Sequence, residues 1–344
     1  MSSTPIPGQG RPVSRRDTLN KDISRIKTAL WLSLFMVLSN LAPVLGAQRV
    51  VDQNGRTLIF ERPFSRIISL YGAHTENLVF LGLDREIIGV SRSDIHDPRF
   101  STTPWFSAHD GPEKFLGARP DLILIRPMIE RGCSRLIQQL ERSGITVVSL
   151  QPADVEGMYD YWTTLGRLTG RNEQAGAMVA DFKHQVAGFR ALTKGIAPKK
   201  QVYFEAIHSK MKTFTPGSMA LFALEVAGGI NVAKDARASR GTNIGNYGKE
   251  QILAHADKID VFLAQQGEMN PVSRETIETE PGFAMIKAVK NNAIYLIDEQ
   301  IVSRPGFRLL QGIKTIGEIL YPDIFGALDP RNSDALIQEK RKAF

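Results

Sequence analysis

The chain has 344 residues, of which 42% are hydrophobic, and its formal net charge is +7. Residues 1–47 hold six basic and two acidic residues, so much of the excess positive charge lies at the amino-terminal end. There is no lysine run and no basic patch interleaved with aromatic residues, so nucleic-acid binding is not expected. The single cysteine, Cys133, excludes an internal disulfide and a metal site built from thiolates.

Residues 28–42 form an apolar segment that follows Arg25 and Lys27 and leads to small residues ending at Ala47. This order predicts a secretory signal peptide over residues 1–47, cleaved near its end, and therefore a periplasmic mature protein. A permanent membrane anchor over residues 28–42 is the alternative, although a span usually needs roughly 20 apolar residues. No cysteine follows the segment, so a lipoprotein anchor by the usual route is not expected.

Short apolar segments alternate with amphipathic ones from Arg66 to Leu150. A hairpin is expected over Arg49–Arg62, because Asn54-Gly55 is a strong two-residue turn signal. Tyr71–His74 is expected to be a turn. The short apolar segments are typical of buried parallel strands, and they are Arg66–Leu70, Ile87–Val90, Leu122–Ile125 and Ile145–Leu150. Helices are expected between them, over Thr75–Leu83, from Gly111 to the stop at Arg119-Pro120, and over Gly132–Ser143.

A long helical stretch is predicted from Asp154 to Gly195. Gly170 divides it, and Pro198 follows Gly195 as a helix stop. Residues 172–199 are expected to form the helix that joins two lobes. Its apolar residues recur near i, i+3, i+4 and i+7, which predicts one buried stripe of Ala175, Met178, Val179, Phe182, Val186 and Phe189.

The same alternation resumes after this helix. Strands are predicted over Gln201–Ile207, Asp260–Ala264 and Ile294–Ile297, with a turn over His208–Thr213. Helices are predicted over Ser218–Ala227, Lys249–Ala256 and Leu310–Leu320.

The predicted fold class is α/β, with two doubly wound lobes joined by a single long rigid helix and a ligand cleft between the lobes. Domains of about 100–200 residues fit the chain length. The expected parts are a signal peptide (1–47), an N-terminal lobe (48–171), a connecting helix (172–199), a C-terminal lobe (200–330) and a tail (331–344). Ligands bind beyond the carboxyl ends of strands in such sheets. Those ends carry Tyr71, Arg92, Met128, His208 and Gln265.

No sequence signature of catalysis or nucleotide binding is present. A glycine-rich GxGxxG after a strand, a P-loop, HExxH and GxSxG are all missing, so the protein is not expected to be an enzyme. No two histidines are spaced i, i+4 on a predicted helix, so no preformed metal motif is offered. His208 is the strongest single candidate for a metal ligand because it follows a strand.

Two segments resemble each other, Gly111–Ile125 and Gly248–Ala264. Each places a glutamate at a helix start, Glu113 or Glu250, and each ends in an apolar strand. A carboxylate there also suits the helix dipole, which is the simplest interpretation of both residues.

In these segments the chain resembles the substrate-binding proteins of ABC importers for iron–siderophore complexes, haem and cobalamin, the class with one rigid helix between its lobes. The resemblance covers about Arg49–Pro322. It is carried by Arg66–Leu83, Pro112–Ile125, Ala227–Ala233, Lys249–Leu263, Ala288–Asp298, Ser303–Arg308 and Tyr321-Pro322.

The resemblance implies a monomeric binding protein with no intrinsic cofactor, whose cargo is a metal chelate. Its implied partner is an ABC permease dimer at the inner membrane. Glu113 and Glu250 stand at the positions that dock onto permease arginines in the family. One exposed carboxylate per lobe would fix the orientation of the complex through charge-assisted pairs.

The expected cargo is a ferric siderophore, with haem or a corrinoid next. Arginines suit anionic groups and aromatic rings suit planar faces. The candidate ligand-binding residues are Tyr71, Arg92, Phe106, Met128, His208, Tyr247 and Arg304, with Trp105 and Phe214 also considered. For Trp105, Phe106 and Phe214 the alternative is packing within a lobe, and for Arg304 it is a pair with a nearby carboxylate.

Three other interpretations stay open at this point. His208 and Met211 could bind a metal centre axially, whereas Lys210, Arg92 and Arg304 would equally suit an oxyanion such as molybdate or tungstate. A tetrapyrrole metal chelatase would use His208 and Glu205 to handle the metal. A membrane-tethered sensor would need residues 28–42 to remain uncleaved.

Overall fold

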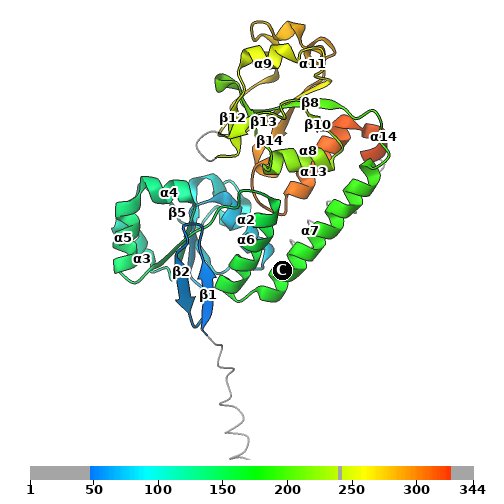
Figure 1. Ribbon diagram of the computed structural model, residues 1–344. Helices are drawn as coiled ribbons and strands as arrows, with labels where there is room; N and C mark the ends of the chain where they lie inside the picture. Colours follow the sequence, from blue (N-terminus) through cyan, green and yellow to red (C-terminus); the bar gives the residue numbers. More distant parts are fainter. Residues whose placement is uncertain (1–46, 239–241, 327–344) are drawn as a thin grey trace, which may run out of the picture. The chain divides into compact units, whose positions relative to one another are not determined.

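The computed structural model describes residues 47–238 and 242–326 (Figure 1). The hydrophobic part of the expected signal peptide, the alternative anchor over residues 28–42 and the tail over residues 331–344 lie outside these ranges. The two main sheets and the helices between them belong to one compact unit that begins at Arg49.

The predicted hairpin is confirmed. Strands β1 (Gln48–Val51) and β2 (Thr57–Phe60) form a separate two-stranded sheet. The buried carboxylate of Asp52 accepts hydrogen bonds from the backbone amides of Asn54 and Arg56, at 3.0 and 2.9 Å, and pairs with the Arg56 guanidinium at 2.7 Å. These bonds close the turn that the Asn-Gly pair predicted.

The first main sheet is entirely parallel, in the order β5-β4-β3-β6-β7. The chain starts in the middle and winds outward to both edges, which is the doubly wound topology. Its strands are β3 (Ile67–Ser69), β4 (Ile87–Ser91), β5 (Trp105–Phe106), β6 (Leu122–Ile125) and β7 (Thr146–Ser149). Its helices are α2 (Gly72–Phe80), α3 (Pro112–Ala118), α4 (Pro127–Gly132) and α5 (Ser134–Arg142), with short 3₁₀ helices at Arg92–Asp94 and Pro98–Phe100.

The expected turn over Tyr71–His74 is wrong. Tyr71 is extended and acts as the N-cap, and α2 begins at the next residue. The amides of His74 and Thr75 both donate to the Tyr71 carbonyl, at 2.8 and 3.2 Å. The helix therefore begins directly at the carboxyl end of the central strand β3.

The helical stretch between the two sheets consists of two helices, α6 (Val155–Thr169) and α7 (Asn172–Thr193). Gly170 separates them in the left-handed conformation, with a φ of +70°, which a residue with a side chain adopts at a cost. The apolar stripe predicted on α7 is confirmed for Ala175, Met178, Phe182, Val186 and Phe189, which are all buried. The helix ends at Thr193, before the predicted Lys199.

The second main sheet is mixed. Its order is β11-β12-β9-β8-β13-β14, with β10 also paired to β8. Strands β8, β10, β13 and β14 are parallel, whereas β9, β12 and β11 run antiparallel to their neighbours. The strands are β8 (Gln201–Ile207), β9 (Lys212–Phe214), β10 (Ile230–Asn231), β11 (Arg237–Ala238), β12 (Ile244–Asn246), β13 (Val261–Gln266) and β14 (Ile294–Asp298).

The expected turn over His208–Thr213 contains the start of a strand instead. A single 3₁₀ turn over His208–Lys210 and a left-handed residue, Met211, reverse the chain, and β9 then returns beside β8. The Thr213 hydroxyl donates to the Phe204 carbonyl at 2.6 Å and holds this return. The second lobe is therefore doubly wound only in its parallel part.

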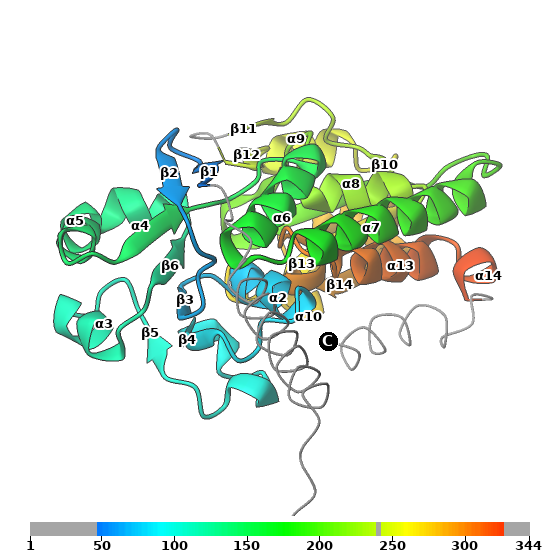
Figure 2. The same cartoon turned by 90° about the horizontal axis from the view of Figure 1, so that it is seen from below.

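Helices surround this sheet and join it to the first half. They are α8 (Met219–Val226), α9 (Lys249–Ala254), α10 (Arg274–Glu278), α11 (Lys287–Lys290), α12 (Glu299–Val302), α13 (Leu309–Leu320) and α14 (Pro322–Phe325). Helices α7, α8 and α13 pack against one another, as Figure 2 shows. The α/β fold class with two sheets and a connecting helix is confirmed.

One hydrophobic core contains residues of both main sheets. Ile67 of β3 and Leu263 of β13 belong to it, with Trp162 of α6 and Phe182 of α7 between them. The rings of Trp162 and Phe182 meet edge to face with 5.3 Å between centroids, and Phe182 also contacts Phe307, at 6.1 Å. Two smaller cores lie on the far faces of the two sheets.

Candidate functional site

The carboxyl ends of the first sheet bring together an aromatic ring and a cation. Tyr71 follows β3, and Arg126 follows β6, which pairs directly with β3. The Arg126 guanidinium carbon lies 4.8 Å from the centroid of the Tyr71 ring. Tyr71 was predicted as a ligand-binding residue, whereas Arg126 was missed. The position of Arg126 immediately after a strand was the signal that identifies it.

His74 lies behind this pair and is not a ligand candidate. Its Nδ1 lies 2.7 Å from the Tyr161 hydroxyl and its Nε2 lies 3.0 Å from the Ile125 carbonyl. Burial lowers the pKa of His74 to about 4, so the ring is neutral at physiological pH. The neutral ring therefore does not add charge to the site.

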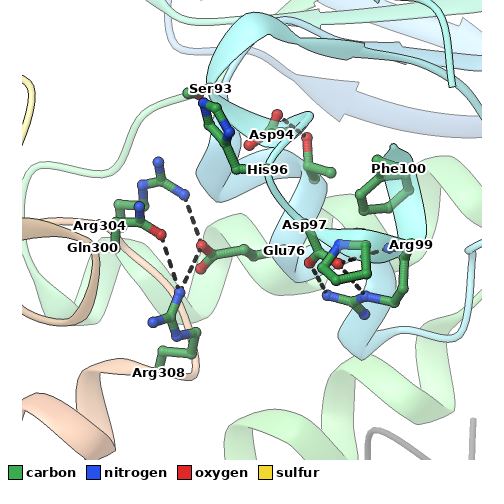
Figure 3. A pocket seen from close by; sticks show the side chains of 12 residues that line it. Glu76, Ser93, Asp94, His96, Asp97, Arg99, Phe100, Gln300, Arg304 and Arg308 are labelled. Carbon is green, nitrogen blue, oxygen red and sulfur yellow. Dashed lines mark hydrogen bonds and ion pairs between the residues drawn. The ribbon is translucent and has the colours of Figure 1, made fainter. Parts of the chain in front are cut away.

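A pocket of about 490 Å³ lies where α2 and the loop after β4 meet the segment that leads into α13 (Figure 3). Thr75 and Glu76 line it from α2, and residues 93–94 and 96–100 line it from the loop. Gln300, Arg304 and Arg308 line it from the second half of the chain. Among the predicted site residues only Arg304 lines this pocket.

Glu76 is the centre of the charged groups in this pocket (Figure 3). Its Oε1 accepts from Arg304 at 2.7 Å and from Arg308 at 3.2 Å. Burial raises the pKa of Glu76, and the two arginines oppose that rise. The simple alternative for Arg304, a pair with a carboxylate, is therefore correct, and its partner lies 228 residues away.

Arg304 also lies directly on the backbone of α2. A Cβ atom at position 72 would stand 2.5 Å from its Nη1, so only glycine permits this approach. The neighbouring Asn77 side chain donates to the Pro305 carbonyl at 2.9 Å. These contacts fasten the segment before α13 to α2.

His208 lies in a buried cluster with two carboxylates. Its side chain is 8% exposed, its Nδ1 lies 3.0 Å from the buried Glu205 carboxylate, and its Nε2 lies 3.5 Å from Glu280. The hydrogen bond to Glu205 raises the pKa of His208 and favours the imidazolium. Both ring nitrogens already lie beside carboxylates, and this arrangement supports neither the predicted metal ligand nor the chelatase.

The other predicted residues divide into buried and exposed ones. Phe106 is 3% exposed and packs on Phe115, and Tyr247 is 5% exposed and packs near Tyr203. Phe214 is also buried, so packing explains all three rings.

Met128 and Trp105 are exposed. Arg92 and Lys114 approach the Trp105 ring, with distances of 5.9 and 4.4 Å to its centroid. These two sites are therefore accessible on the surface.

Glu113 and Glu250 occupy matching places. Each is the second residue of a short helix, α3 or α9, that follows a glycine, and each is exposed. Each carboxylate turns back toward its glycine, Gly111 or Gly248. Neither glutamate forms an ion pair with another residue in the described part of the chain, so both carboxylates are available to a partner.

Two features are absent from the described residues. Within residues 47–238 and 242–326, no helix is both long and apolar enough to cross a membrane. In the same ranges no group of three or more His, Cys, Asp and Glu side chains is placed to hold a metal ion.

The fold and the accessible residues at the strand ends describe a two-sheet binding protein. The model of the periplasmic binding protein family matches residues 67–301, and the chain therefore belongs to that family. The resemblance stated from the sequence is thus confirmed. The protein is a substrate-binding component of an ABC transporter that acts outside the cytoplasm.

Individual relatives agree with this assignment. The uncharacterized ABC transporter substrate-binding lipoprotein YvrC of Bacillus subtilis is 25% identical over 278 residues, covering 80% of this chain and 85% of that protein. A cobalamin-binding protein of Halobacterium salinarum is 26% identical over 190 residues, which is 54% of this chain and 50% of that protein.

A solved structure is similar as well. It is described as a possible iron-binding, periplasmic solute-binding protein from Staphylococcus epidermidis. Its TM-score is 0.65 at 28% identity, and the match covers 76% of this chain and 100% of that chain.

Proposed function

We propose that this protein captures a metal chelate, a ferric siderophore first and haem or a corrinoid next, and delivers it to an ABC permease without catalysing a reaction. Delivery to the permease is supported by the matched pair Glu113 and Glu250. The two carboxylates stand at equivalent helix starts in the two halves and have no ion-pair partner within the described residues.

The physical argument concerns orientation. One anion per half defines two points, so a permease with two cationic sites accepts the protein in one alignment. A charge-assisted hydrogen bond to an arginine contributes about 1.5–3 kcal/mol. With two such contacts each half of the protein is attached to the permease, and loss of either contact would weaken docking substantially.

The cargo is inferred from the side chains at the strand ends and from the relatives. Tyr71, Arg126 and the exposed Arg92 supply an aromatic face and cations where ligands bind in such sheets. Relatives whose names state iron or cobalamin binding support a chelate as the cargo class. An oxyanion such as molybdate or tungstate is the alternative cargo.

The docking proposal is tested by binding of the full-length protein to its permease in detergent or nanodiscs. Glu113→Ala and Glu250→Ala are each expected to weaken binding about tenfold or more, because each removes one charge-assisted contact. The double variant should bind far more weakly than either single variant.

Glu156→Ala is the matched control for this test. Glu156 is also exposed and is also the second residue of a helix, α6, but it belongs to neither repeat segment. Binding of this variant should equal that of the natural protein. If Glu113→Ala, Glu250→Ala and Glu156→Ala all bind equally well, the assignment of docking to the two glutamates is refuted.

A further inference from the structure

Exposed apolar side chains border Glu113 in the first half. On α3 the ring of Phe115 is fully buried in a core of the first sheet, so Glu113 and Leu116, three residues apart, lie on the outer side of the helix. Leu116 is 40% exposed, and the exposed Trp105 ring lies beside the same helix, with its centroid 4.4 Å from Lys114 Nζ. The Glu113 carboxylate therefore stands next to apolar surface that is open to solvent.

The same arrangement occurs around Glu250 in the second half. On α9 Ile252 is fully buried, and Leu253, three residues after the glutamate, is half-buried. Leu253 lies against the segment after α10, because a Cβ atom at Gly282 would stand 3.1 Å from its Cδ1. The amide of Met285 donates to the Gly282 carbonyl at 3.1 Å, and the Met285 side chain is 65% exposed. Met285 thus supplies beside α9 the exposed apolar surface that Leu116 supplies on α3.

Neighbouring lysines do not neutralise the two glutamates. Lys114 pairs with Asp110 at 2.7 Å, and Lys249 pairs with Glu280. Each lysine is adjacent in sequence to one of the glutamates, yet its charge is shared with another carboxylate. Among the described residues, each half therefore presents a carboxylate without an ion-pair partner beside exposed apolar surface. We call these two groups the docking patches. The first consists of Glu113, Leu116 and Trp105, and the second consists of Glu250, Leu253 and Met285.

The repetition indicates what covers the docking patches. Single exposed apolar side chains are common on protein surfaces and need no explanation. Two matched groups, each beside an unpaired carboxylate on an equivalent helix, fit one partner that has two equivalent sites. Apolar side chains around an ion pair exclude water from it and so strengthen the attraction between the charges. The partner is therefore expected to be cationic and apolar at the same two places.

We propose that the two docking patches form a composite surface for the permease, which presents at each site an arginine bordered by an apolar recess. Leu116 and Met285 fill these recesses while the glutamates pair with the arginines. This inference rests on the proposed function, because it describes the partner's surface at the two docking sites. It adds an apolar contribution to the ionic one, and salt distinguishes the two, since it screens exposed charges but does not weaken apolar contact.

The test measures binding of the full-length protein to its permease in nanodiscs. Leu116→Ser should weaken binding about five- to twentyfold, and Met285→Ser about tenfold or more, because each removes apolar area that the partner covers. Leu116→Met keeps an apolar side chain and should bind like the natural protein. Leu192→Ser is the matched control, because Leu192 is 37% exposed on α7 and belongs to neither docking patch.

Repeating the measurement at high salt separates the apolar contribution from the ionic one. At about 0.5 M salt the Debye length is roughly 4 Å, so exposed charges are strongly screened. The loss of binding caused by Glu113→Ala should therefore shrink, whereas the loss caused by Leu116→Ser should persist. A Leu116→Ser loss that disappears at high salt would overturn the apolar contact.

Two measurements on the protein alone exclude other roles for the docking patches. Because both side chains are exposed, Leu116→Ser and Met285→Ser should leave the urea midpoint unchanged, and a marked fall would show that they stabilise the fold instead. Analytical ultracentrifugation at micromolar concentration should show a monomer. A dimer that Leu116→Ser dissociates would overturn the permease as the occupant in favour of a second copy of the chain.

The outcomes distinguish failure of this inference from failure of the proposed function. If Leu116→Ser and Met285→Ser bind the permease as well as Leu192→Ser does, while Glu113→Ala and Glu250→Ala bind weakly, the apolar contribution is overturned and ionic docking stands. If the glutamate variants also bind as well as the natural protein, docking through these helices is overturned, and the composite surface with it.

Discussion

Two buried ionic clusters in this protein have opposite composition and opposite surroundings. Around Glu76, one carboxylate serves two arginines, the residues come from both halves, and the cluster lines a pocket (Figure 3). Around His208, two carboxylates face one imidazole, and all three residues belong to the second half.

The difference teaches how a buried charge can be assigned a role. In the His208 cluster the excess negative charge is balanced internally, because Lys249 pairs with Glu280. That cluster fixes the end of β8 and ties α9, the helix that carries Glu250, to the loop after α10. The Glu76 cluster lies beside a pocket whose lining also includes Asp94, and it joins segments of the two halves. The His208 cluster therefore stabilises the fold of the second half. The Glu76 cluster lies beside a pocket, where it can respond to a bound ligand or to a movement of the two halves.

The largest expected effect follows from opening the closed cluster. Glu205→Ala should lower the free energy of unfolding by about 3 kcal/mol, because it leaves the buried His208 ring without its closest hydrogen-bond partner. Urea denaturation at neutral pH measures the loss. In the double variant with His208→Ala the loss should be smaller than the sum of the single losses, and strict additivity would show that the two side chains do not interact.

An intermediate effect is expected at the pocket. Glu76→Gln should cost about 2 kcal/mol, because both arginines keep a neutral acceptor but lose the charge that they share. The exposed pair Arg190–Glu225, 3.3 Å apart, is the control, and Glu225→Gln should change stability by less than about 0.5 kcal/mol. Equal losses in the two variants would show that the Glu76 cluster contributes no more than a surface pair.

The smallest expected effect is a pH dependence that belongs to only one cluster. The pKa of His208 is raised from the ordinary 6.5, so its stabilisation is complete below that value and is lost as the pH rises through the raised pKa. The stability advantage of the natural protein over His208→Gln should therefore shrink as the pH is raised above neutrality. Urea midpoints at a series of pH values test this, and an advantage that grows with pH would reverse the assignment.

Local patterns were sufficient to predict most of the fold. Strand β8 occupies Gln201–Ile207 as predicted, because its apolar residues Val202, Tyr203, Phe204 and Ala206 are buried on both faces of the sheet. Glu113 and Glu250 could also be located, since a glycine, a glutamate and an apolar strand are local signals. The mixed character of the second sheet was missed. The chain reverses at Met211, which adopts the left-handed conformation, and no glycine or asparagine at that position indicated the reversal.

The site was predicted less well because its contacts join distant residues. Glu76 and Arg304 are 228 residues apart, and nothing in either segment indicates the other. Phe106 and Tyr247 were plausible ligand residues by type, but Phe106 packs on Phe115 and Tyr247 packs near Tyr203, and both rings are buried. Arg126 was overlooked in favour of Met128, although it stands one residue after β6.

The core shared by both sheets has a consequence for how the protein reports that it is loaded. Wide separation of the halves would expose apolar surface around Trp162 and Phe307 to water, at about 25 cal/mol for each Å². The empty and loaded forms are therefore expected to be close in shape, so that a permease would meet no large rearrangement. Under the docking proposed above, discrimination would rest on small changes in the spacing of Glu113 and Glu250, and the empty protein would compete with the loaded one.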